Sequence, residues 1–211
     1  MRENSPRIFL LSPARAGGPR YEMLVRSGAR FDLAVKLRET GASVGEVYTF
    51  ISGLYFRGKM AYANAFSAAP EGAPGCLVMV PGAGLIPPET MVTIEQLESI
   101  AGVDVDEDNK AFTEPLCSAA KLLDQHAGPE CQYVLLGSVA SGKYVEPLIE
   151  IFGERLVFPG DFVGRGDMSR GGLMLRCARA ETELSYTPVK GALRHGARPP
   201  RLPKLARWPK Q

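Results

Sequence analysis

A hydroxyl and a guanidinium follow the first apolar run of the sequence, at a place where the chain turns. Residues 7–12 form a short apolar run that ends in Ser12, and Arg15 follows beside Gly17 and Gly18. Arginine is suited to a bidentate grip on phosphate or carboxylate. We therefore predict a catalytic role for Ser12 and ligand binding by Arg15, with an arginine in a solvated loop as the alternative.

A second group of polar residues follows the apolar run 132–136 and enters an expected helix. Ser138, Lys143 and Tyr144 lie in this segment. Backbone amides at the start of a helix favour an anion, to which Lys143 adds charge and Tyr144 a ring or a hydroxyl. We predict ligand binding by these three residues. Plain helix capping by Ser141, with Lys143 in solvent, is the alternative.

The segment Phe158 to Gly172 combines charges of both signs with five glycines. Asp161 can act as a base or orient a water molecule, which makes it a candidate catalytic residue. Asp167 is expected to cap the helix that follows. Arg165 and Arg170 are predicted to bind ligand through phosphate groups, and pairing with the two aspartates is the alternative.

Gly82 and Gly84 follow another apolar run and can bring backbone amides close to a ligand. The chain has neither the full dinucleotide fingerprint nor a Walker A sequence, so NAD or ATP binding in the standard modes is disfavoured and no cofactor is expected. The four cysteines are spread out without a CxxC pair, and no metal site is expected. Buried reduced thiols, and no apolar run long enough to span a membrane, indicate a cytoplasmic protein.

Two further regions have the composition of a nucleic-acid contact. Tyr55, Arg57 and Lys59 mix an aromatic ring with cations, and such neighbours can stack on bases and hold a backbone, although helical aromatics are more often core. Residues 190–211 hold seven basic and no acidic residues, whereas residues 1–189 hold 18 basic and 23 acidic ones. Such a tail attracts phosphate, and a solvated tail is the alternative. The predicted tail contacts are Arg198, Arg201, Lys204 and Arg207.

The elements that must position these residues alternate between strand and helix. Apolar strands that alternate with helices predict an α/β fold: a single domain, residues 1–189, with a mostly parallel sheet of about five strands and helices on both faces, followed by the tail 190–211. Ligands of such sheets gather at the carboxyl ends of the strands. The expected strands are 7–12, 76–80, 132–136, 155–158 and 183–189. The expected helices are 20–40, 43–51, 54–66, 93–100, 113–126, 141–152 and 167–178.

Several of these segments together resemble a known family. Leu11 to Arg15 is similar to the N-terminal signature of the YaaA family of peroxide-stress proteins, in which a lysine stands at the place of Arg15. Ser52 to Lys59 and Val80 to Pro88 resemble motifs of YaaA-like domains, as does Gly142 to Tyr144 with a different spacing. The likeness extends over roughly residues 7 to 175, and Pro81 to Ala83 replace a serine-containing turn.

The resemblance implies an α/β fold and a nucleic-acid setting, because YaaA proteins are associated with DNA binding and oxidative-stress protection. Such domains also look like the uracil-glycosylase-like domains attached to deazaguanine tRNA enzymes. Nucleic acid, a nucleoside or a nucleotide is therefore the expected partner, and the sequence leaves the oligomeric state open.

Three hypotheses for function follow. The first is an enzyme that acts on a nucleobase N-glycosidic bond, with Asp161 polarising water while Arg15, Lys143 and Arg165 hold phosphates. The second is a DNA- or RNA-binding module without turnover, and the third is a ligand-sensing domain. The chain has two histidines, and neither completes a Ser-His-Asp arrangement. Whether the protein is an enzyme at all stays open at this point.

Overall fold

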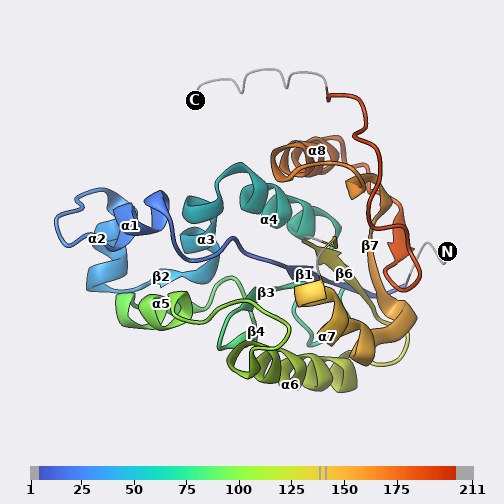
Figure 1. Ribbon diagram of the computed structural model, residues 1–211, viewed down its shortest axis with the longest axis horizontal. Helices are drawn as coiled ribbons and strands as arrows, with labels where there is room; N and C mark the ends of the chain where they lie inside the picture. Colours follow the sequence, from blue (N-terminus) through green and yellow to red (C-terminus); the bar gives the residue numbers. More distant parts are fainter. Residues whose placement is uncertain (1–4, 138, 141, 203–211) are drawn as a thin grey trace.

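The computed structural model describes residues 5–137, 139–140 and 142–202, and its centre is a six-stranded sheet (Figure 1). The strands are β1 (Arg7–Leu11), β3 (Cys76–Val80), β4 (Gly84–Ile86), β6 (Gln132–Leu136), β7 (Leu156–Pro159) and β8 (Tyr186–Pro188). Their order is β4-β3-β1-β6-β7-β8. The four inner strands are parallel, and both edge strands are antiparallel. The predicted α/β fold with a mostly parallel sheet is confirmed.

The inner strands are apolar because both faces of the sheet are covered. Four residues of β1 and all five residues of β3 are buried, as expected for strands of a parallel sheet between two helical layers. The edge strand β4 was not expected. Residues 81–83 form a tight turn with Gly82 at a φ of 78°, so that β4 folds back onto β3 as a hairpin.

Helices α4 (Leu54–Phe66) and α8 (Asp167–Ala180) lie on one face of the sheet, and α6 (Lys110–Ala127) and α7 (Gly142–Phe152) on the other (Figure 1). Helices α4 and α8 approach closely because glycines meet at their contact. A Cβ at Gly58 would lie 2.6 Å from the carbonyl oxygen of Gly171. Helices on both faces of the sheet confirm the predicted layers.

Several helix boundaries differ from the prediction. The expected helix 20–40 is two helices, α1 (Pro19–Val25) and α2 (Asp32–Glu39), and Gly28 lies between them. Helix α6 starts earlier than the expected residue 113, because the Asn109 side chain caps it by accepting a hydrogen bond from the Ala111 amide. Asp167 is the first residue of α8 rather than its cap, which is Gly166.

A smaller group of elements lies beyond the carboxyl ends of the strands (Figure 1). It contains α1, α2, α3 (Val44–Ser52), α5 (Ile94–Ala101) and the two-stranded ribbon of β2 (Ala42–Ser43) with β5 (Met91–Val92). Ser43 and Glu46 form a capping box at the start of α3, in which each side chain satisfies a backbone amide of the other residue. Two single-turn 3-10 helices, Gly153–Arg155 and Gly160–Phe162, flank β7. Among the described residues, no helix is long and apolar enough to cross a membrane.

Candidate functional site

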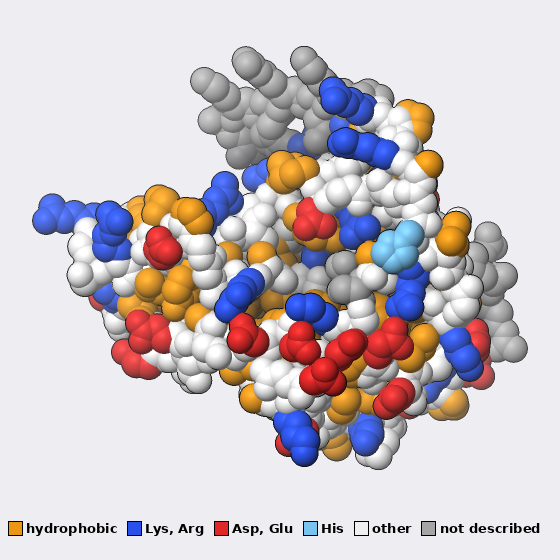
Figure 2. Space-filling view, viewed as in Figure 1, with side chains coloured by type: hydrophobic (Ala, Val, Ile, Leu, Met, Phe, Trp, Pro, Cys, Tyr) orange, Lys and Arg blue, Asp and Glu red, His pale blue; other side chains and the backbone are white. Residues whose placement is uncertain are grey.

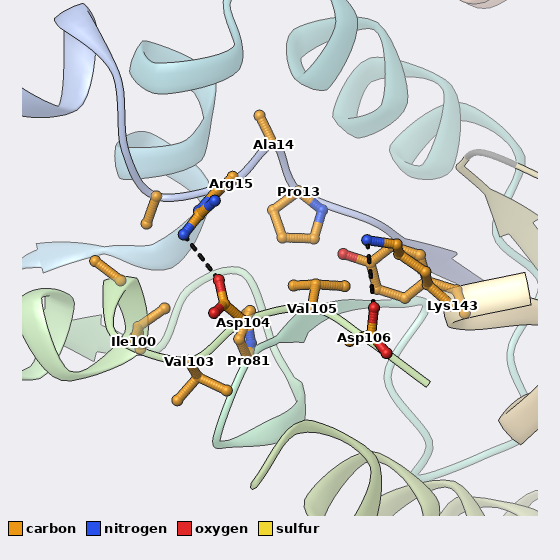
Figure 3. A pocket seen from close by; sticks show the side chains of 13 residues that line it. Pro13, Ala14, Arg15, Pro81, Ile100, Val103, Asp104, Val105, Asp106 and Lys143 are labelled. Carbon is orange, nitrogen blue, oxygen red and sulfur yellow. Dashed lines mark hydrogen bonds and ion pairs between the residues drawn. The ribbon is translucent and has the colours of Figure 1, made fainter. Parts of the chain in front are cut away.

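A pocket of about 480 Å³ lies at the carboxyl ends of the central strands (Figure 3). We call it the strand-end pocket. Its walls come from the segment after β1, the turn after β3, the loop after α5 and the start of α7. The predicted ligand residues Arg15, Lys143 and Tyr144 all line it, so two predicted segments that are far apart in the sequence meet here. The other lining residues are Pro13, Ala14, Ala16, Pro81, Ile100, Ala101, Val103, Asp104, Val105 and Asp106.

Acidic residues face the two cations of this pocket. The Arg15 guanidinium lies 2.8 Å from Asp104, and the Lys143 ammonium lies 3.9 Å from Asp106 (Figure 3). All four side chains are about half exposed or more, so each pair adds little stability. The pairs nevertheless balance the charge of the pocket. The position of Asp104 and Asp106 against these cations could not be read from the sequence.

A buried amine lies beside the end of β1. Lys59 is 2% exposed, and its Nζ donates hydrogen bonds to the Ser12 carbonyl oxygen at 2.5 Å and to the Ser12 Oγ at 3.0 Å. Ser12 itself is 5% exposed. The Lys59 Nζ also lies 3.9 Å from the centroid of the Tyr55 ring. A Cβ at Gly137, after β6, would collide with the Ser12 Oγ, so a glycine there keeps space around the hydroxyl.

Burial shifts the pKa values of Lys59 and Tyr55. Removal from water lowers the pKa of Lys59 to about 7, with Asp167 raising and Arg170 lowering it to a smaller extent. Burial also raises the pKa of Tyr55 to about 12, although the Arg170 guanidinium lies near enough to oppose this effect. The two groups do not meet the geometry of a hydrogen bond: among the described residues, the buried Tyr55 hydroxyl has no partner.

The predicted surface cluster of Tyr55, Arg57 and Lys59 is divided between surface and core. Arg57 is exposed, Tyr55 is partly buried and Lys59 is buried. Residues two apart on a helix point in different directions, so Arg57 and Lys59 cannot share one face. We had expected Lys59 to contact nucleic acid, but it is buried and does not lie on a surface open to such a ligand. The helical spacing alone could have indicated this division.

The charged residues around the start of α8 are spread over different environments. Asp161 is exposed in the 3-10 helix after β7, and neither it nor Ser12 lines the strand-end pocket. The Arg165 Nε donates to the Asp161 carbonyl oxygen at 3.0 Å. Arg170 is 7% exposed, donates to the Phe162 carbonyl oxygen at 3.2 Å and lies 3.8 Å from Asp167. The alternative to ligand binding was that these arginines pair with the two aspartates. Arg170 with Asp167 is such a pair.

Gly82 lies in the hairpin turn between β3 and β4, and Gly84 is the first residue of β4. A Cβ at Gly84 would lie 2.6 Å from the Pro115 carbonyl oxygen, so this glycine allows α6 to pack against the turn. Gly82 lines a separate shallow hollow of about 250 Å³ beside α5. Both glycines have positive φ angles, 78° and 83°. The chain geometry of the turn and the helix contact already require glycine at these two positions.

A second concave surface, which we call the arginine groove, lies between α8 and residues 198–202. It has a volume of about 340 Å³ and is lined by Arg165, Arg176, Arg198 and Arg201, with no acidic residue among the lining residues that the structure describes. Its other lining residues are Leu54, Met168, Ser169, Gly172, Pro199, Pro200 and Leu202. Arg165, predicted to bind ligand, therefore lies here with the predicted tail contacts Arg198 and Arg201 rather than in the strand-end pocket. The predicted contacts Ser138, Lys204 and Arg207 lie outside the described residues.

One face of the protein is hollowed in its middle, with Lys and Arg side chains around the hollow and a row of Asp and Glu side chains along one side (Figure 2). Within the described ranges, His, Cys, Asp and Glu side chains form no group of three that could hold a metal ion. A scan against protein-family models and searches of curated proteins and of solved structures found no match to this chain.

Proposed function

We propose that this protein binds nucleic acid, and that the arginine groove holds the phosphate backbone. The observation that supports this proposal is the convergence of four arginines on one concave surface without an acidic side chain among its described lining residues. Planar guanidinium groups match the oxygens of a phosphate, and phosphate contacts supply most of the affinity for a nucleic-acid backbone. The resemblance to YaaA-like domains points to the same class of partner.

The segment that closes the groove is suited to holding its arginines in place. Pro199 and Pro200 separate Arg198 from Arg201, and a proline ring restricts the backbone to extended conformations. The backbone that carries the two arginines therefore loses less conformational freedom when a phosphate is bound. Met168 is 66% exposed at the edge of the groove and offers an apolar surface to a base or a sugar.

The strand-end pocket fits a different part of the ligand. Its cations already face Asp104 and Asp106, and this acidic loop opposes the approach of a phosphate. A volume of about 480 Å³ is in the range of small-molecule sites, and the partly apolar lining suits an uncharged nucleoside or base. We propose that phosphates occupy the arginine groove and that this pocket receives a nucleoside portion.

A binding titration with a matched charge control tests the groove. We would measure fluorescence anisotropy of labelled single- and double-stranded 20-mers at two salt concentrations. The variant Arg198→Glu/Arg201→Glu is compared with Arg26→Glu/Arg30→Glu, which makes the same change of net charge on exposed residues near α1 and α2. The groove variant is expected to weaken binding at least tenfold and to lower the slope of log K against log salt by about two, because two phosphate contacts are lost.

Two results would contradict this proposal. The first is absence of binding by the wild-type protein at low salt. The second is an equal loss of affinity in the two double variants, because this would mean that net charge, rather than the groove, attracts the nucleic acid. A normal affinity in the control, together with weak binding by the groove variant, supports the assignment.

A further inference from the structure

The contact between Lys59 and Ser12 has no part in the binding function proposed above. Among the described residues, both hydrogen bonds of the buried Lys59 amine go to neutral oxygens of one residue, Ser12, 47 positions earlier in the chain. A lysine is almost never fully buried unless it is paired. An amine that is held against a hydroxyl at the end of a central strand is an arrangement used in nucleophilic catalysis.

We propose that Ser12 and Lys59 form a nucleophile–base pair that cleaves a carboxylic ester or amide, with the Ser12 Oγ as the attacking atom. The distance between Oγ and Nζ, 3.0 Å, is within the reach of direct proton transfer. The hydrogen bond from Nζ to the Ser12 carbonyl oxygen, at 2.5 Å, uses one amine proton and fixes the position of the nitrogen. Serine–lysine pairs have the same roles in unrelated folds.

The position of the pair suits these roles. Ser12 is slightly more exposed than Lys59 and is followed directly by Pro13 and Ala14, which line the strand-end pocket. Ser12 itself is not among the residues that line this pocket, and its neighbours Pro13 and Ala14 join the pair to it along the chain. The Tyr55 hydroxyl is buried, and among the described residues it has no partner that meets the geometry of a hydrogen bond, although the Arg170 guanidinium lies near it.

The reaction balances without a cofactor. The neutral Lys59 amine accepts the proton of the Ser12 hydroxyl while the Oγ forms a bond to the carbonyl carbon of the substrate. The bond from this carbon to the leaving group then breaks, and the Lys59 ammonium returns the proton to the leaving alcohol or amine. Water attacks the acyl-serine next, Lys59 takes the proton of the water, and that proton returns to the Ser12 Oγ when the acid leaves.

The charged and titratable groups around Lys59 are consistent with a base. From its own helix the Tyr55 ring lies over the amine, and from α8 Asp167 raises its pKa while Arg170 lowers it. Burial dominates and brings the pKa to about 7. The amine is therefore neutral in an appreciable fraction of molecules at neutral pH, whereas an exposed lysine is almost entirely protonated.

The test uses p-nitrophenyl acetate as the probe, with the full chain and with Ser12→Ala, Lys59→Met and the control Lys121→Met on the exposed side of α6. Release of nitrophenolate is followed by absorbance, and the acetylated residue is located by peptide mass spectrometry. We expect an acetyl group on Ser12, formed at a rate that rises through pH 7 and then levels. Lys59→Met should lose at least a hundredfold in rate, since a general base contributes about this much, and Lys121→Met should match the wild type.

The wild-type pH profile tests the pair even where a variant does not fold, and circular dichroism establishes which variants do. Three outcomes would overturn the proposal: no acetyl group on Ser12, an acetyl group on Lys59 instead, or an unchanged rate in a folded Lys59→Met protein. None of them bears on oligonucleotide binding in the arginine groove, so this proposal and the binding proposal can fail separately.

Discussion

The pH dependence of stability offers a test of the buried Lys59 amine that needs no substrate. In the folded protein, burial lowers the pKa of Lys59 from 10.5 to about 7. Between these pH values the unfolded chain binds more protons than the folded one, so stability rises with pH. The cost of the buried charge is fully present below pH 7 and disappears as the pH approaches 10.5. Replacement by methionine removes this dependence.

The magnitude follows from the difference between the two pKa values. A difference of about 3.5 units corresponds to about 5 kcal/mol over the whole range, at about 1.4 kcal/mol per unit. Between pH 7 and pH 9 the part that is recovered is about 2 kcal/mol, because Lys59 is already half neutral at pH 7 and the unfolded lysine is still mostly protonated at pH 9.

The assay is urea unfolding of the wild type and of Lys59→Met at pH 7 and pH 9. The two proteins share every other titratable group, so the difference between them isolates Lys59. On going from pH 7 to pH 9, we expect the wild type to gain about 2 kcal/mol relative to the variant, or about 1 M in the urea midpoint at a slope of about 2 kcal/mol per M. At both pH values the variant also leaves the oxygens of Ser12 without their donor, which is a constant loss.

This reasoning would be refuted if the difference in stability between the wild type and Lys59→Met were the same at pH 7 and at pH 9. It would mean that Lys59 keeps the pKa of an exposed lysine, and that the amine is not removed from water in the folded protein. A difference that changes in the opposite direction would mean that a nearby carboxylate dominates the environment of the amine instead of burial.

Two further predictions concern packing and ion pairing. Gly58→Ala should destabilise the protein by about 1–3 kcal/mol, because the new Cβ would press on the Gly171 backbone. The control Gly28→Ala, where a Cβ meets open space, should change stability by less than about 0.5 kcal/mol. Urea unfolding measures both changes. Burial raises the pKa of Asp124, but hydrogen bonds led by that from Arg155 outweigh it and leave the pKa lowered. The wild type should therefore be more stable than Asp124→Asn at pH 7, and this difference in unfolding free energy should decline below about pH 4. Acid unfolding of the two proteins measures it, and identical acid unfolding curves would contradict the prediction.

The sequence alone predicted the central sheet and most of the helices, because these depend on local patterns. A run such as 132–136, apolar at nearly every position, has to be covered on both faces, and this favours a parallel sheet between helices. Capping boxes such as that of Ser43 and Glu46 are equally local. Arg15, Lys143 and Tyr144 could be assigned to one pocket because the carboxyl ends of parallel strands meet at one edge.

Contacts between distant segments were decided by the tertiary structure. The amine of Lys59 reaches Ser12 because α4 packs over the end of β1, and the sequence does not show which side of α4 faces the sheet. The arginine groove joins residues 165 and 201, and no local pattern relates them. The ion pair of Arg15 with Asp104 likewise joins two segments that lie far apart in the sequence. Periodicity reports the environment of a segment, whereas the choice of its neighbour depends on packing that the whole chain determines together.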